Sequence, residues 1–198
     1  MNALLKHHLV VVLGLGLLSS SLPAQDKPEE VPEGVIHGPK AAYSIAPPKG
    51  WVMDTKSGAA NGLPCVMYPK GAAWDSTEVL IYGKISAPDM EDMKEYIALG
   101  IQHMSKKRPG FKHQEISKGK TSEGYEWIIT EYAPTEAYPR AERVACVQLP
   151  KSVAIIVYSA KDMAVCQKHA AALDEVVKSF MSEPDYIGAG AKKAGKTE

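Results

Sequence analysis

Histidine is the side chain best suited to bind a metal or move a proton near neutral pH, and the sequence has six. Beyond residue 24 they stand at His37, His103, His113 and His169. No two have His-x-x-x-His spacing and none lies beside a cysteine pair at zinc-site spacing, so we expect no structural zinc. His113 and Glu115 share one face of a predicted strand, but two candidate ligands often coincide by chance. We predict no metal site and no cofactor.

Catalytic motifs are equally weak. Ser159, Asp162 and His169 are the residue types of a hydrolase triad, but no nucleophile-elbow sequence surrounds the serine. The Gly-Lys-Thr segment 119–121 lacks the preceding glycine-rich half of a phosphate-binding loop. It also lies between two predicted strands, which indicates a hairpin. We therefore predict no catalytic residues and a protein that is not an enzyme.

Three cysteines, Cys65, Cys146 and Cys166, are too few for a scaffold built on disulfides. Cys146 lies on a predicted strand and Cys166 on the apolar side of the last predicted helix, so a disulfide between them is possible. A Cys65–Cys146 pair is nearly as plausible. The alternative is three buried free thiols, since free cysteine is among the most buried residue types. None of the three has a neighbouring base that would make it a nucleophile.

The N-terminus has the pattern of a secretory signal peptide. Lys6 precedes the apolar run Leu9–Leu18, and the small-residue segment Leu22–Ala24 follows it. The apolar run is shorter than the roughly 20 residues that a membrane-spanning helix needs. We expect residues 1–24 to be removed, leaving no stable membrane span, and the protein to be periplasmic or extracellular. The alternative is that this segment is retained as a membrane anchor.

Composition and charge narrow the remaining possibilities. The 23 basic and 23 acidic residues cancel, which removes the electrostatic argument for binding nucleic acid. Residues 25–40 are rich in proline and glutamate and are predicted to be an exposed leader. Residues 182–198 are predicted to be a disordered tail. Between them, residues 41–181 have the size of a single domain.

Within that domain, strand and helix patterns alternate along the chain. A helix is predicted from the apolar stripe that begins at Met90 and Met93 and ends at Met104, and a second from Asp162 to Phe180. The expected strands lie at 43–45, 51–53, 65–68, 77–85, 113–118, 125–133, 143–149 and 152–160. Because the last strand is apolar on both faces, it needs cover on both sides. The predicted fold is α+β: an α/β/α sandwich with a mainly antiparallel sheet of about six to seven strands and helices on both faces.

Two segments resemble a known family. The run Tyr-Ser-Ile-Ala-Pro-Pro-Lys-Gly-Trp at 43–51, together with the last strand and helix at 154–162 and 173–180, is similar to the PsbP-like family. The middle of the domain, around 68–71 and Trp74, looks closer to uncharacterised bacterial secreted members. The resemblance implies an α/β/α sandwich and a non-catalytic binding or assembly role. It transfers no functional residues, because no partner-binding motif is recognisable here.

Trp74 lies in the polar loop 71–77, so we expect it to be the most exposed of the three tryptophans and a candidate partner contact. The predicted function is a secreted, non-enzymatic binding or assembly module for an unknown protein or envelope component. The alternative is a small-ligand or metal-binding periplasmic protein with a pocket between sheet and helix.

Overall fold

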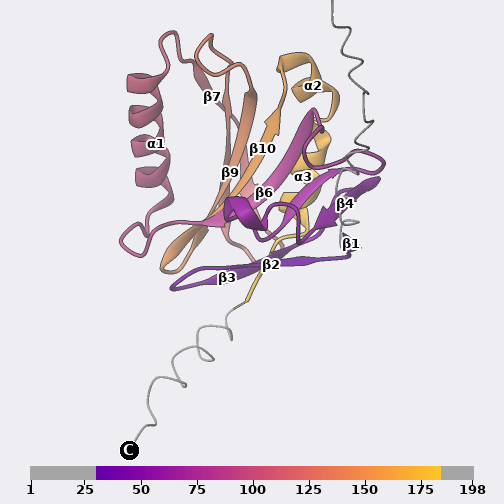
Figure 1. Ribbon diagram of the computed structural model, residues 1–198. Helices are drawn as coiled ribbons and strands as arrows, with labels where there is room; N and C mark the ends of the chain where they lie inside the picture. The colour runs from indigo at the N-terminus through magenta and orange to yellow at the C-terminus, as the bar shows by residue number, and fades with distance from the viewer. Residues whose placement is uncertain (1–29, 184–198) are drawn as a thin grey trace, which may run out of the picture.

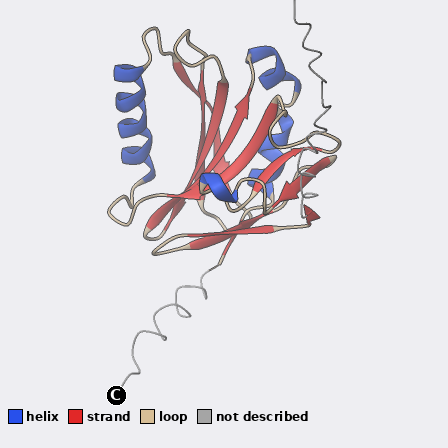
Figure 2. Cartoon of the chain, in the orientation of Figure 1, coloured by secondary structure: helices blue, strands red, loops and turns tan. Residues whose placement is uncertain are grey.

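Eight antiparallel strands form the main sheet of the computed structural model, which describes residues 30–183 (Figures 1 and 2). In spatial order the strands are β1 (Glu30–Val31), β4 (Trp51–Asp54), β5 (Val66–Pro69), β6 (Val79–Ile85), β10 (Ser152–Ala160), β9 (Ala141–Leu149), β8 (Glu126–Tyr132) and β7 (His113–Lys120). A second sheet has the order β11 (Met181–Ser182), β3 (Ala42–Ile45) and β2 (Gly34–His37). The helices are α1 (Met93–Lys107), α2 (Met163–Lys168) and α3 (Ala171–Lys178), with a short 3₁₀ helix, η1 (Ala59–Asn61).

Strand β10 lies at the centre of the sheet, and all nine of its residues are buried. Because side chains alternate between the faces of a strand, β10 contributes to two separate apolar clusters. Val153, Ile155 and Val157 pack with Met93 of α1. The alternating residues on the other face pack in the larger cluster with α2, α3 and the small sheet. The α+β class and the mainly antiparallel pairing are as predicted.

The main sheet has eight strands, so the expected number of six to seven was too low. Part of the difference comes from the segment predicted to be an exposed leader. Glu30–Val31 pairs with β4 in the main sheet, whereas Gly34–His37 of the same segment pairs with β3 in the second sheet. Gly34 and Ile36 are buried while their neighbours are exposed, an alternation that the proline- and glutamate-rich composition hid.

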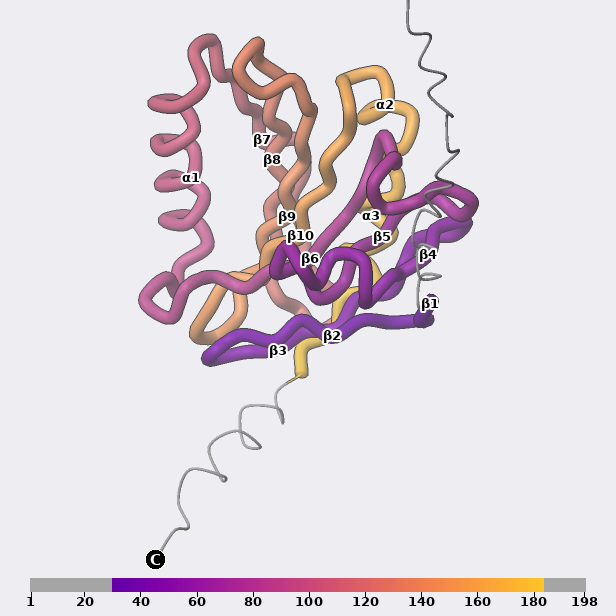
Figure 3. The backbone as a smooth tube through the Cα atoms, viewed as in Figure 1, coloured from indigo at the N-terminus to yellow at the C-terminus, as the bar shows by residue number. Residues whose placement is uncertain are grey.

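Helix α1 begins three residues later than the stripe that predicted it. The Asp92 side chain caps the helix by accepting a 2.8 Å hydrogen bond from the backbone N–H of Glu95. Met90 therefore belongs to the preceding loop. The helix ends before Arg108, and Gly110 follows with a φ of +75°, a conformation that favours glycine. Figure 3 shows α1 as the connection between β6 and β7, which have three strands between them in the sheet.

The second predicted helix is two shorter helices. Asp162 caps α2 through a 2.9 Å hydrogen bond from the N–H of Val165. The chain leaves helical geometry at His169, where ψ is +20°, and α3 begins at Ala171. The His169 ring meets Trp51 edge-on, with 6.0 Å between ring centroids.

Residues 1–29 and 184–198 lie outside the described part of the chain, and with them the predicted signal peptide and most of the predicted tail. Met181 and Ser182, at the border of that tail, pair with β3. Between residues 30 and 183, no helix combines the length and the apolar character needed to cross a membrane.

Candidate functional site

The structure separates the two cysteines with the best predicted pairing. Cys146 lies in β9 and packs with Val153 and Ile155 in the cluster that α1 covers. Cys166, in α2, belongs to the cluster on the opposite face. All three cysteines are buried free thiols, and burial raises the pKa of the Cys146 thiol to about 12. Such thiols are neutral and unreactive at physiological pH.

Trp74 is half-buried, in contrast to the expected exposure. Its ring packs against a small cluster that includes Val52, Leu63 and Tyr68. The polar sequence of the 71–77 loop did not reveal this cluster, because its members come from other segments. A role for Trp74 in contacting a partner stays a prediction.

The other sequence candidates are dispersed. Ser159 accepts a 2.8 Å hydrogen bond from Nε of Arg140, Asp162 caps α2, and His169 packs against Trp51. His113 and Glu115 do line one hollow beside α1. Within residues 30–183, however, no three His, Cys, Asp or Glu side chains come close enough together to hold a metal ion.

Helix α1 covers the sheet incompletely. Met93 is its only buried residue, and its other inward side chains are half-buried. A hollow of about 220 Å³, here called the α1 hollow, opens between the helix and β6, β8, β9 and β10. Its floor is apolar and consists of Val144, Ile155 and Val157.

Three tyrosines surround this floor. Tyr82 comes from β6, Tyr96 from α1 and Tyr132 from β8. Tyr132 is buried, whereas Tyr82 and Tyr96 are half-buried. Burial, with the nearby Glu142 charge, raises the pKa of Tyr82 to about 12, and burial also raises the pKa of Tyr96. Both hydroxyls therefore stay protonated, and neither has a hydrogen-bond partner among the described residues.

Gly100 lines the α1 hollow. It lies in the middle of α1, where glycine costs about 1 kcal/mol relative to alanine. A Cβ atom built at Gly100 would have no atom within 4 Å. Tight packing therefore does not explain the glycine, and a side chain at this position would enter space that is now empty.

The charged groups at the α1 hollow differ in how well they are paired. Both Glu142 oxygens are engaged: Oε1 accepts a 2.8 Å hydrogen bond from the Tyr138 hydroxyl, and Oε2 lies 3.4 Å from Arg108. The Arg108 guanidinium also stacks 3.8 Å from the centroid of the Tyr138 ring. Lys84 instead lies over the Tyr82 ring, with Nζ 5.2 Å from the centroid. No carboxylate between residues 30 and 183 forms an ion pair with it.

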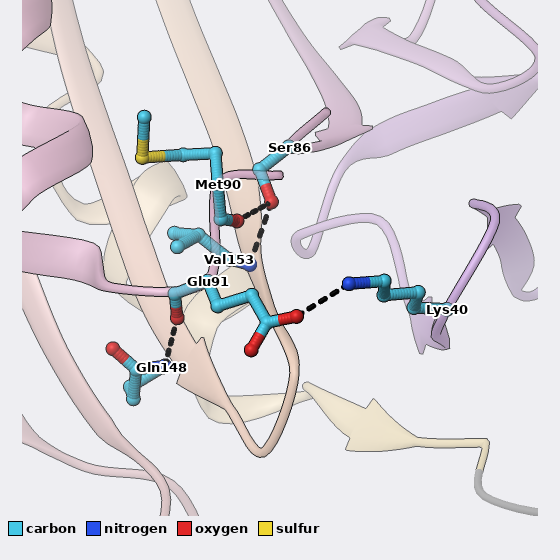
Figure 4. Close-up of polar contacts among 6 residues, drawn as sticks. All are labelled: Lys40, Ser86, Met90, Glu91, Gln148 and Val153. Carbon is cyan, nitrogen blue, oxygen red and sulfur yellow. Dashed lines mark hydrogen bonds and ion pairs between the residues drawn. The ribbon is translucent and has the colours of Figure 1, made fainter. Parts of the chain in front are cut away.

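Hydrogen bonds fix the N-terminal end of α1 to the sheet (Figure 4). The Gln148 side chain accepts a 2.8 Å hydrogen bond from the N–H of Met93 and donates one of 2.7 Å to the carbonyl of Glu91. The Ser86 hydroxyl donates to the carbonyl of Met90, and the Glu91 side chain pairs with Lys40. Arg108 and Glu142 provide a matching contact at the other end of the helix.

The chain is only weakly similar to known proteins. No family model matches the chain, and no curated protein matches it. Solved structures do. The solution structure of a cyanobacterial PsbP, CyanoP, from Synechocystis has 15% sequence identity and a TM-score of 0.47, covering 85% of this chain and 100% of that one.

Two further structures match at similar levels. The Ran-binding protein Mog1p of Saccharomyces cerevisiae has 14% identity and a TM-score of 0.45, covering 70% of this chain and 89% of its own. A Pseudomonas aeruginosa protein of unknown function has 14% identity and a TM-score of 0.44, covering 77% and 98%. All three TM-scores lie below 0.5, and membership of the PsbP-like family stays a prediction from the sequence.

The α1 hollow was not predicted residue by residue, although the sequence carries two traces of it. Tyr96 and Gly100 are four residues apart and therefore share a helix face, and Tyr82 and Lys84 alternate on one strand face. What the sequence does not show is that these two faces meet, because that depends on the order of strands in the sheet.

Proposed function

We propose that the chain is a non-enzymatic binding protein whose site is the α1 hollow. The observation that carries the proposal is an open hollow lined by Gly100 and by three tyrosines from separate elements, with free space where a Cβ atom of residue 100 would lie. Pockets of this kind, with an apolar floor and a few polar groups, are typical of small-molecule sites. This favours the small-ligand alternative over a flat partner-binding surface. The proposal assumes the predicted α/β/α arrangement, because the α1 hollow forms only where α1 packs across one face of the sheet.

The protonation and hydrogen bonding of the titratable groups at the α1 hollow agree with ligand binding rather than catalysis. The Glu142 carboxylate has both oxygens occupied, and the tyrosine hydroxyls keep their protons at neutral pH. A general base needs a free acceptor whose pKa lies near the working pH. The groups at the α1 hollow are therefore suited to holding a ligand in place.

A leucine in place of Gly100 tests the site. Gly100→Leu places a side chain into the α1 hollow, and Gln102→Leu adds the same side chain to an exposed position of the same helix. Ligand-observed NMR of a mixed fragment library should show fragments that bind the wild type and Gln102→Leu but not Gly100→Leu. If no fragment distinguishes Gly100→Leu from Gln102→Leu, the α1 hollow is not the site.

We also propose that the protein is secreted, as predicted for an uncharacterised bacterial member of the PsbP-like family. The support is the pattern of Lys6, the apolar run 9–18 and the small residues ending at Ala24. Mass spectrometry of the protein expressed in a bacterium should find it in the periplasm with Gln25 as its first residue. Leu13→Arg should block export, and an uncleaved chain in the cytoplasm of the wild type would contradict secretion.

A further inference from the structure

We infer that the ligand of the α1 hollow, whose role as a binding site rests on the function proposed above, is a small organic anion with a flat apolar body. Three features of the hollow point to this class: its unpaired positive charge, its free hydroxyl donors and its apolar floor.

The charge comes from Lys84. The negative group at the hollow, Glu142, is already neutralised by Arg108 and hydrogen-bonded to Tyr138. The ammonium of Lys84 has only the face of the Tyr82 ring as a counterpart among the described residues. Lys84 is exposed, so a bound carboxylate would replace water at its ammonium with an ion pair, while a bound cation would have to displace Lys84 from the ring.

The hydroxyl groups complement the same kind of ligand. The hydroxyls of Tyr82 and Tyr96 are protonated and make no hydrogen bond to the rest of the described chain. A phenolic O–H donates readily to a carboxylate, and such charge-assisted hydrogen bonds are stronger than neutral ones. Lys84 and these two hydroxyls are thus donors around one hollow.

The floor and the volume define the rest of the ligand. Val144, Ile155 and Val157 offer an apolar surface, and the tyrosine rings around it favour stacking against a flat group. The volume of about 220 Å³ lies below the usual range for drug-sized ligands. A single ring that carries one carboxylate matches these dimensions.

Three probes test the charge of the ligand at nearly constant shape. Each carries one phenyl ring, and they differ in charge: phenylacetate is an anion, phenylacetamide is neutral and phenethylamine is a cation. Isothermal titration calorimetry of the full chain should show phenylacetate binding with a dissociation constant on the order of 1 mM. The amide should bind several-fold more weakly and the amine should bind least. Lys84→Met should weaken phenylacetate binding about fivefold and remove its advantage over the amide. Lys106→Met, which removes an exposed lysine from α1 away from the hollow, should leave binding unchanged.

The outcomes distinguish this inference from the proposed function. If the amide or the amine binds as tightly as phenylacetate and Gly100→Leu blocks it, the anionic class is wrong while the α1 hollow remains the site. If phenylacetate binds equally well to wild type, Lys84→Met and Gly100→Leu, both are wrong. If no probe binds at about 10 mM, the anionic class is rejected, and the fragment comparison with Gly100→Leu decides the site separately.

Discussion

The Tyr68 hydroxyl donates a 2.7 Å hydrogen bond to Oδ2 of Asp54, and both side chains are buried. The other carboxylate oxygen, Oδ1, accepts the backbone N–H groups of Lys56 at 2.8 Å and Ser57 at 3.0 Å. Burial alone would raise the pKa of Asp54, but the hydrogen bonds from Ser57, Tyr68 and Lys56 outweigh it and lower the pKa below its usual value.

Asp54 should therefore make the stability of the fold sensitive to acid. A carboxyl whose pKa is lower in the folded state stabilises the protein above its unfolded pKa, about 3.9 for aspartate. That stability is lost as the pH falls through the folded value. Urea denaturation between pH 7 and pH 3 should show the free energy of unfolding decreasing at the acid end.

The variant Asp54→Asn isolates this contribution. It should destabilise the protein at pH 7 by about 1–3 kcal/mol and flatten the acid-dependent loss. Asp89→Asn, at an exposed loop position, should retain the wild-type pH profile. An unchanged profile in Asp54→Asn would show that other groups cause the acid sensitivity.

Gly83 and Gly100 should respond to alanine in opposite directions. A Cβ at Gly83 would lie 2.6 Å from the Tyr43 hydroxyl and 2.7 Å from Cγ1 of Ile36. The Tyr43 hydroxyl cannot easily retreat, because it donates to the carbonyls of Lys84 and Ile155 at 3.0 Å each. Gly83→Ala should therefore destabilise the protein by about 1–3 kcal/mol. Thermal and urea unfolding measure this change.

Gly100→Ala is the matched control for Gly83→Ala, because it adds the same methyl group at a position with open space around it. Its new methyl group meets no atom within 4 Å, so the gain in helix propensity should stabilise the protein by about 1 kcal/mol. A destabilised Gly100→Ala would mean that the hollow beneath α1 is narrower than described.

Gln148 should control the attachment of α1. Its amide binds the N–H of Met93 and the carbonyls of Glu91 and Leu149. Gln148→Leu leaves these backbone groups without their partner, which should cost about 1–3 kcal/mol. Hydrogen exchange should accelerate in the first turn of α1, while Gln102→Leu should leave exchange there unchanged.

The cysteines provide a test of the core. Because Cys65, Cys146 and Cys166 are all unpaired in the structure, we expect all three thiols to be free. Alkylation of the native protein at pH 8 should be slow, since burial raises the pKa of each thiol. Denaturation without reductant should then expose three reactive thiols. A single reactive thiol would instead reveal a disulfide.

The sequence predicted those elements whose pattern is local. Strand β10 is apolar at nearly every position, and the short turn at 150–151 indicated its pairing with β9. The apolar stripe of α1 was also evident, although Asp92 as the cap was not. Strand β2 was missed because its burial depends on pairing with β3 rather than on its composition.

The candidate site could not be predicted from local sequence patterns, because it also depends on long-range pairing. Tyr82, Tyr96 and Tyr132 come from three segments that are brought together only by strand order and by α1 crossing over three strands. Gly100 conveyed nothing by itself, since a glycine in a helix has several explanations. The strands and helices were therefore predictable from local sequence patterns. The candidate site was not, because it depends on which strands and helices become neighbours in the fold.

The position of β6 beside β10 also sets a delay during synthesis. Residues 79–85 pair with residues 154–160, so one edge of β6 has no partner until residues 154–160 have been made. At about 5–20 residues per second, this interval lasts on the order of several seconds. An apolar strand with an open edge can pair with another nascent chain during that time. The emerging protein should therefore be most prone to aggregation before β10 is released from the ribosome.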